Sequence, residues 1–109
     1  MHTREDVRIL SESASGYIGL CHCCGNIMLK FNNLLMKLKE DELKVLGDYF
    51  SQFEMDMLNK KERGDHEICI NTPCPNICFS FTIAEISALT YLLNEACVLI
   101  NALDILDLK

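Results

Sequence analysis

The sequence has few of the features that mark nucleotide-binding, nucleic-acid-binding or exported proteins. Its five glycines are scattered, so they form no glycine-rich phosphate-binding loop. Its ten lysines and arginines do not cluster, and sixteen acidic residues give a net charge of -6. We therefore expect no nucleic-acid partner, because such surfaces depend on clustered basic residues. The charged N-terminus lacks the apolar stretch of a signal peptide, which predicts a cytoplasmic protein.

The chain also lacks a long apolar run without polar groups. Its most apolar segment, residues 83–106, contains Glu85, Asn94, Glu95, Asn101 and Asp104. Polar groups this frequent do not suit a membrane-spanning helix, so we expect no membrane partner. The composition is half apolar and one quarter charged, which is globular, and 109 residues fit one domain. Residues 1–15 are polar and unpatterned, which predicts a disordered or frayed N-terminus before a single domain over 16–109.

Alternating apolar residues predict three strands in the first half of the chain. Residues 17–21 form a short expected strand, and Gly25 with Asn26 supplies a chain reversal. Residues 27–31 and 34–38 alternate on either side of two asparagines, which predicts a hairpin with a two-residue turn. The expected pairs are Phe31 with Leu34, Leu29 with Met36, and Ile27 with Leu38. This register places all six side chains on one face.

The period then changes to that of an amphipathic helix. Apolar residues recur at alternating spacings of three and four at Leu43, Leu46, Phe50, Phe53 and Met57. Residues 40–42 are all acidic, and the helix dipole favours anions in a first turn. Gly47 within this helix suggests a close contact with another backbone.

The second half of the chain repeats this order. Residues 68–70 and 77–81 alternate around a turn that contains both prolines, and Thr82 with Glu85 forms a capping box before a helix to about Asp107. The halves share a strand pattern that is as well explained by common supersecondary structure as by duplication. The sequence therefore predicts an α+β domain, with an antiparallel sheet of about five strands (a strand, then hairpin and helix twice) packed by two helices on one face.

The last helix is long and broadly apolar. About 26 residues correspond to roughly 39 Å, which exceeds the body of a domain this size. One row consists of Ile86, Leu89, Leu93, Ala96, Ile100 and Leu103, and a second set widens it: Leu92, Leu99, Ile105 and Leu106. Because exposed apolar side chains forgo burial, we expect a homodimer through this helix. The alternative is a wide sheet that covers the whole apolar face.

The seven cysteines are the main candidates for chemistry. Cys21 and Cys24 form a C-x-x-C-G motif between two strands, which is typical of a zinc knuckle; a thioredoxin-like motif would instead begin a helix. If Thr72 pairs with Ile77, Cys69 and Cys78 lie diagonally on the face away from the core. The expected metal ligands are Cys21, Cys24, Cys74 and Cys78, with Cys69 as a substitute for either of the last two. The alternative is that these cysteines are small apolar residues without a ligand.

No arrangement of residues indicates an enzyme. His22 and His66 have no serine or aspartate at a telling spacing, and the acidic residues are distributed for helix capping and solubility. We therefore expect no catalytic residue.

The stretch CHCCGNIMLKFNNLLMKL, followed by an acidic helix start, resembles an uncharacterised family of short Bacteroidota proteins of about 110 residues with a C-x-x-C-G motif. The resemblance covers residues 17–107 and implies no activity. The cysteines at 69, 74 and 78 are not part of that family's pattern, which favours Cys21 and Cys24 as the metal pair. A metal would then be shared across a dimer, or completed by His22 or His66.

These observations predict a small non-enzymatic interaction or structural protein, dimeric through its C-terminal helix, with an unidentified protein partner and a zinc knuckle. The alternative is a cytoplasmic thiol-redox or metal-handling protein that uses Cys21 and Cys24. A third candidate is an anionic regulator that binds a basic partner by charge complementarity.

Overall fold

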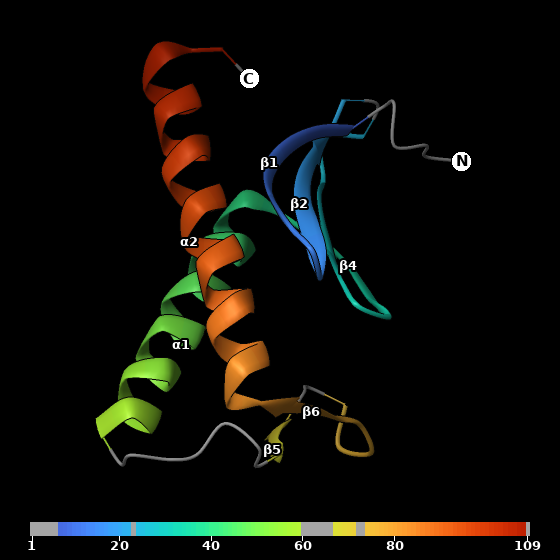
Figure 1. Ribbon diagram of the computed structural model, residues 1–109. Coiled ribbons are helices and arrows are strands. Elements are labelled where there is room, and N and C mark those ends of the chain that lie inside the picture. Colours follow the sequence, from blue (N-terminus) through green and yellow to red (C-terminus); the bar gives the residue numbers. More distant parts are fainter. Residues whose placement is uncertain (1–6, 23, 60–66, 72–73, 109) are drawn as a thin grey trace.

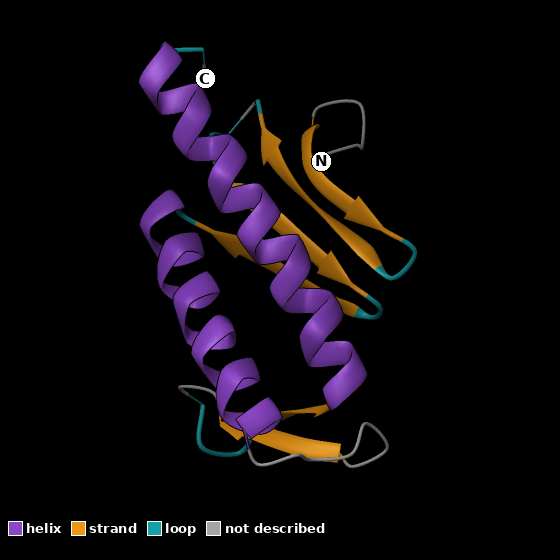
Figure 2. Cartoon of the chain, turned by 60° about the vertical axis from the view of Figure 1, so that its left-hand side comes forward, coloured by secondary structure: helices purple, strands orange, loops and turns teal. Residues whose placement is uncertain are grey.

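The computed structural model describes residues 7–22, 24–59, 67–71 and 74–108. The element order is β1 (Val7–Ser13), β2 (Gly16–Cys21), β3 (Ile27–Phe31), β4 (Leu34–Leu38), α1 (Glu40–Asn59), β5 (Glu67–Asn71), β6 (Cys78–Thr82) and α2 (Ile83–Leu106). β1 to β4 form one antiparallel sheet in that order, and β5 pairs with β6 in a second sheet. The two helices lie side by side on one face of the larger sheet (Figures 1 and 2).

The fold is therefore α+β, as predicted, although the described strands number six and form two sheets in place of one. An aromatic cluster connects the small sheet to the rest of the core. The Phe81 ring on β6 lies 6.0 Å from that of Phe31 on β3 and 6.3 Å from that of Phe50 on α1. Side-chain packing, and not strand pairing, thus joins the hairpin of β5 and β6 to the domain.

The predicted register of the central hairpin is confirmed. β3 and β4 pair Ile27 with Leu38, Leu29 with Met36, and Phe31 with Leu34. The three β3 side chains are buried, and Asn32 in the turn has a φ of 53°, a conformation that asparagine tolerates better than most residues. Alternation together with the turn sequence was sufficient to predict this register.

The N-terminus departs from the prediction. Residues 7–13, expected to belong to a frayed segment, form β1 at the edge of the sheet, while residues 1–6 lie outside the described residues. The pairing of β1 with β2 shifts between Ile9 and Ser11, which is the signature of a β-bulge. The bulge leaves Leu10 and Ser11 both buried, so β1 lacks the alternation that would have revealed it.

The two helices begin in equivalent ways. At the start of α1 the Lys39 N–H donates to Glu42 Oε1 at 2.8 Å, and at the start of α2 the Thr82 N–H donates to Glu85 Oε1 at 2.9 Å. The Thr82 hydroxyl also accepts from the Glu85 N–H, which completes the predicted capping box. In both helices a glutamate three residues after the residue that precedes the helix accepts from that residue's N–H, in agreement with the repeated pattern in the sequence.

Gly47 marks the place where the helices meet. A Cβ at this position would lie 3.3 Å from Cys97 Sγ on α2, and its next neighbours are other side-chain atoms of α2. The expected close contact is therefore with side chains of α2 and not with a backbone. Cys97, which is partly buried, fills the space that glycine leaves.

Candidate functional site

The bend after β2, where a zinc knuckle was predicted, is a tight turn held by two backbone hydrogen bonds. The Gly25 N–H donates to the Cys21 carbonyl at 2.9 Å, and the Cys21 N–H donates to the Asn26 carbonyl at 2.8 Å. Gly25 has a φ of 73°, which glycine adopts without strain. Cys21 is fully buried, whereas Cys24 is exposed, and Cys23 lies outside the described residues. Strand β3 follows the bend, so the thioredoxin-like arrangement with a helix after the motif does not occur here.

The second hairpin carries another pair of thiols. β5 and β6 pair Cys69 with Ser80 and Asn71 with Cys78, which is the predicted register and makes the two cysteines diagonal neighbours. Both are exposed. The pKa of Cys69 is raised above its ordinary value, first because a thiolate there would be repelled by Cys78, and further because the two thiols are hydrogen-bonded. Cys74 is exposed in the turn, where its carbonyl accepts from the Ile77 N–H.

The predicted four-cysteine set is not assembled in one place within the chain. Asn32 Nδ2 donates to Glu85 Oε2 at 3.3 Å, so the turn between β3 and β4 lies at the start of α2, directly after β6. Cys21 is at the far end of β2 from this turn, about 17 Å away at 3.3 Å per strand residue. The hairpin of β5 and β6 lies at the opposite end of the molecule from the bend at Cys21 (Figure 1).

Cys21 and Cys24 are thus separated from Cys74 and Cys78. Among the described residues, no group of three or more histidine, cysteine, aspartate or glutamate side chains could hold a metal ion. His22 is exposed beside the bend, and His66 lies outside the described residues. A zinc site at Cys21 and Cys24 stays a prediction. It would need further ligands that are not grouped with these two cysteines among the described residues.

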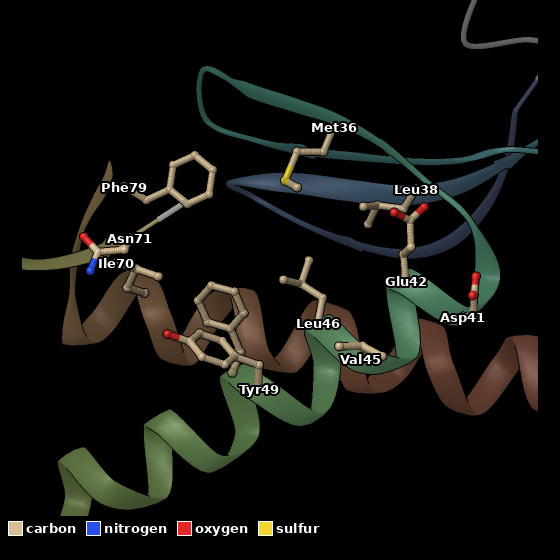
Figure 3. Close-up of a pocket in the computed structure, with 11 residues that line it drawn as sticks. Met36, Leu38, Asp41, Glu42, Val45, Leu46, Tyr49, Ile70, Asn71 and Phe79 are labelled. Carbon is tan, nitrogen blue, oxygen red and sulfur yellow. The ribbon is translucent and has the colours of Figure 1, made fainter. Parts of the chain in front are cut away.

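An apolar groove, which was not predicted, lies between α1, β4 and the small sheet. Its volume is about 510 Å³, and Figure 3 shows its lining: Met36 and Leu38 on β4, Asp41, Glu42, Val45, Leu46, Tyr49 and Phe50 on α1, Ile70 and Asn71 on β5, and Phe79 on β6. Val45 and Tyr49 are 68% and 48% exposed, so they form an open wall. They lie one turn apart, outside the buried stripe of α1, and an apolar pair at such positions is a sequence signal for a surface groove.

The two ends of the groove differ in charge, one being acidic and the other aromatic and uncharged. Asp41 and Glu42 line the end formed by the first turn of α1, whereas Tyr49 and Phe79 line the other end (Figure 3). No lysine or arginine is among the described residues that line it. The groove can therefore receive apolar side chains along its length and a positive charge at the acidic end.

A second apolar surface runs along α2 on the side away from the core. The predicted core row, from Ile86 to Leu103, is buried, whereas Tyr91, Val98 and Ile105 are 61%, 70% and 84% exposed at seven-residue intervals. By length and hydropathy alone α2 could cross a membrane, a criterion that buried core helices also meet. We call this surface the outer stripe: Tyr91, Val98 and Ile105 together with Ala84 and Ala102, with the exposed Glu95 in its middle and Ala88, which also packs against the core, at its edge.

The comparisons with known proteins identify the chain only at the level of a family. A model for a family of unknown function, DUF6686, matches residues 1–109. The chain belongs to this family. The match agrees with the uncharacterised family that the sequence motif suggested, while a Bacteroidota source and a family-wide C-x-x-C-G motif stay predictions. No curated protein and no solved structure matches the chain significantly.

Proposed function

We propose that this DUF6686 chain is a small non-enzymatic interaction protein that binds an extended peptide segment of a partner protein beside β4. The observation that carries the proposal is the apolar groove, whose volume of about 510 Å³ lies in the range of specific binding sites. Its exposed walls, Val45 and Tyr49, gain burial only when something occupies it.

The geometry of β4 supports an extended partner. β4 is the last strand of the larger sheet, and within the described residues no strand pairs with its outer edge. An exposed edge offers a row of backbone donors and acceptors, and peptides are recognised at such edges by strand addition. Met36 and Leu38 on β4 also line the groove, so an added strand would direct alternate side chains into it.

Charge complementarity defines the partner further. Asp41 and Glu42 close one end of the groove, and the whole chain carries a net charge of -6. A lysine or arginine flanking the apolar residues of the peptide would therefore strengthen binding and accelerate association at low salt. The third candidate from the sequence was an anionic regulator that binds a basic partner. The present proposal includes that candidate when the bound peptide carries a lysine or arginine.

The test is binding of a fluorescein-labelled peptide KVTVTV, measured by fluorescence anisotropy. We expect Val45→Lys to weaken binding about tenfold, which corresponds to about 1.4 kcal/mol, because it places a charge in the apolar wall. Val98→Lys is the matched control, since Val98 is 70% exposed on α2 and does not line the groove. Peptides KVTPTV and EVTVTV should bind more weakly, through loss of strand pairing and of charge complementarity. Equal binding by both protein variants would reject the groove.

The same protein is proposed to be a homodimer through the outer stripe of α2. Steps of four and three residues lead from Ala84 through Ala88, Tyr91, Glu95, Val98 and Ala102 to Ile105, the spacing of a coiled-coil seam. With two copies antiparallel about the middle of this stripe, Ala84 faces the partner's Ile105 and Tyr91 faces the partner's Val98. Small residues then oppose large ones at the ends, which allows close approach along about 32 Å of helix.

Oligomeric state is measured by light scattering during size-exclusion chromatography at micromolar concentration. Val98→Lys should convert the dimer to a monomer, while Val45→Lys should leave the dimer intact. These two variants therefore exchange roles between the peptide and dimer experiments. A wild-type monomer would refute the dimer and leave the groove proposal standing.

A zinc knuckle at Cys21 and Cys24 is retained as a second candidate, supported by the positive φ of Gly25 and the tight bend. The antiparallel dimer through α2 would keep its two bends far apart, because the bend lies near the C-terminal end of α2: Arg8, paired with Leu20, donates to the Leu108 carbonyl. His22 or His66 would therefore have to help complete the site, and native protein should contain one zinc per chain. Metal-free protein whose melting temperature is unchanged by a chelator would reject this site.

The redox alternative predicts rapid alkylation of Cys24. An alkylation rate equal to that of an ordinary thiol would reject this alternative.

A further inference from the structure

The exposed face of the small sheet brings two thiols together without a packing role for either. Ile68, Ile70, Phe79 and Phe81 take the core side of this sheet, and Cys69 and Cys78 lie on the other side. Both cysteines are exposed, and they are diagonal neighbours across the pairing of Asn71 with Cys78. Burial therefore does not account for these two sulfurs, in contrast to Cys97 between the helices.

We infer that Cys69 and Cys78 form a two-coordinate site for a soft monovalent cation of the Cu(I) class. Thiolate sulfur is the preferred protein ligand of such ions. Two ligands suffice for an ion that coordinates linearly, whereas a tetrahedral zinc site needs four. The pair of thiols on the exposed face of the small sheet therefore matches the two ligands that a linearly coordinated ion needs.

The strand register favours a bridging ion over a disulfide. Diagonal neighbours in an antiparallel pair have Cα atoms about 7–8 Å apart, and a disulfide seldom forms beyond about 7 Å without movement of the backbone. Two metal–sulfur bonds span a wider gap than one sulfur–sulfur bond. Both thiols are exposed on the same face of the small sheet, so an ion can reach them without disturbing the core.

Charge also favours a cation. The two thiolates repel each other, and the carboxylate of Glu67, on the same strand and the same face, adds to this repulsion of Cys69. When Cu(I) binds, two S–H bonds break, two Cu–S bonds form and two protons leave to the solvent, with no change in oxidation state. The bound ion cancels one of the two negative charges, so the site carries a charge of -1.

The experiment is a titration of the reduced full chain with Cu(I) under anaerobic conditions, in competition with a chromophoric Cu(I) chelator. Cys69→Ser and Cys78→Ser should each lower the tight binding stoichiometry by one ion per chain, and the loss should be the same in the double variant. Cys97→Ser, which changes a thiol between the two helices, should retain it. Proton release should fall by two per chain in each of the first two variants.

A relocated pair provides the second test. Combining Cys69→Ser with Asn71→Cys places the two thiols directly opposite each other, because Asn71 pairs with Cys78. This double variant should recover the lost ion, which a folding defect in Cys69→Ser would not permit. Unchanged stoichiometry in Cys69→Ser and Cys78→Ser would overturn the site, and so would an equal loss in Cys74→Ser, since the ion would then have a third ligand.

Discussion

The buried hydrogen bond of Ser11 gives the most direct test of the N-terminal strand. Ser11 on β1 is 3% exposed, and its Oγ donates to the Leu92 carbonyl of α2 at 2.8 Å. This bond connects the edge strand β1 to α2, and the two bonded residues are 81 positions apart in the sequence. Ser11→Ala removes the donor, while Leu92 lies within α2 and its carbonyl keeps the acceptor position of a helical residue. The cost is therefore that of one net hydrogen bond, about 1 kcal/mol.

The free energy of unfolding is measured by urea denaturation and checked by thermal melting. A loss of about 1 kcal/mol corresponds to a fall in Tm of about 5 °C for a domain of this size. Ser15→Ala is the control: Ser15 is half-buried in the turn after β1, and its N–H and carbonyl, which the substitution keeps, make its hydrogen bonds to Ser13 and Asn32. It should change stability by less than about 0.5 kcal/mol. Equal effects of the two substitutions, or none from Ser11→Ala, would refute the docking of β1.

Three other predictions test the helices. Gly47→Ala should stabilise α1 by about 1 kcal/mol when Cys97→Ala removes the sulfur 3.3 Å from the new Cβ, and by less in the wild type; additive effects in urea denaturation would contradict this contact. Thr82→Ala should cost about 1 kcal/mol by the same measurement, because it removes the cap of α2. The pKa of Tyr91 is raised above 10.0 by its hydrogen bond to Glu95, so the folded state holds this proton more tightly than the unfolded state. The stability that this bond contributes is complete below the unfolded-state pKa of about 10 and is lost as the pH rises through the folded-state pKa. An ultraviolet titration should show a lower pKa for Tyr91 in Glu95→Ala. An unchanged pKa would contradict the bond.

The sequence by itself determined the elements whose causes are local. Alternation on both sides of Asn32 defined the β3–β4 register, and the positions of Thr82 and Glu85 defined the start of α2. Gly25 marked the bend after β2, because only residues that tolerate a positive φ suit it. Each of these features depends on neighbours within a few residues, so the pattern of residue types is sufficient to predict it.

Tertiary structure decided what depends on contacts between distant segments. The bulge near Leu10 removed the alternation of β1, and the strand is held by pairing with β2 and by α2, neither of which a local pattern contains. The small sheet joins the domain through Phe81 and not through pairing with β4, which leaves the groove open and separates Cys78 from Cys21. Which strand edges meet is set by packing of the whole core, and this is why the expected single sheet and single cysteine cluster each became two.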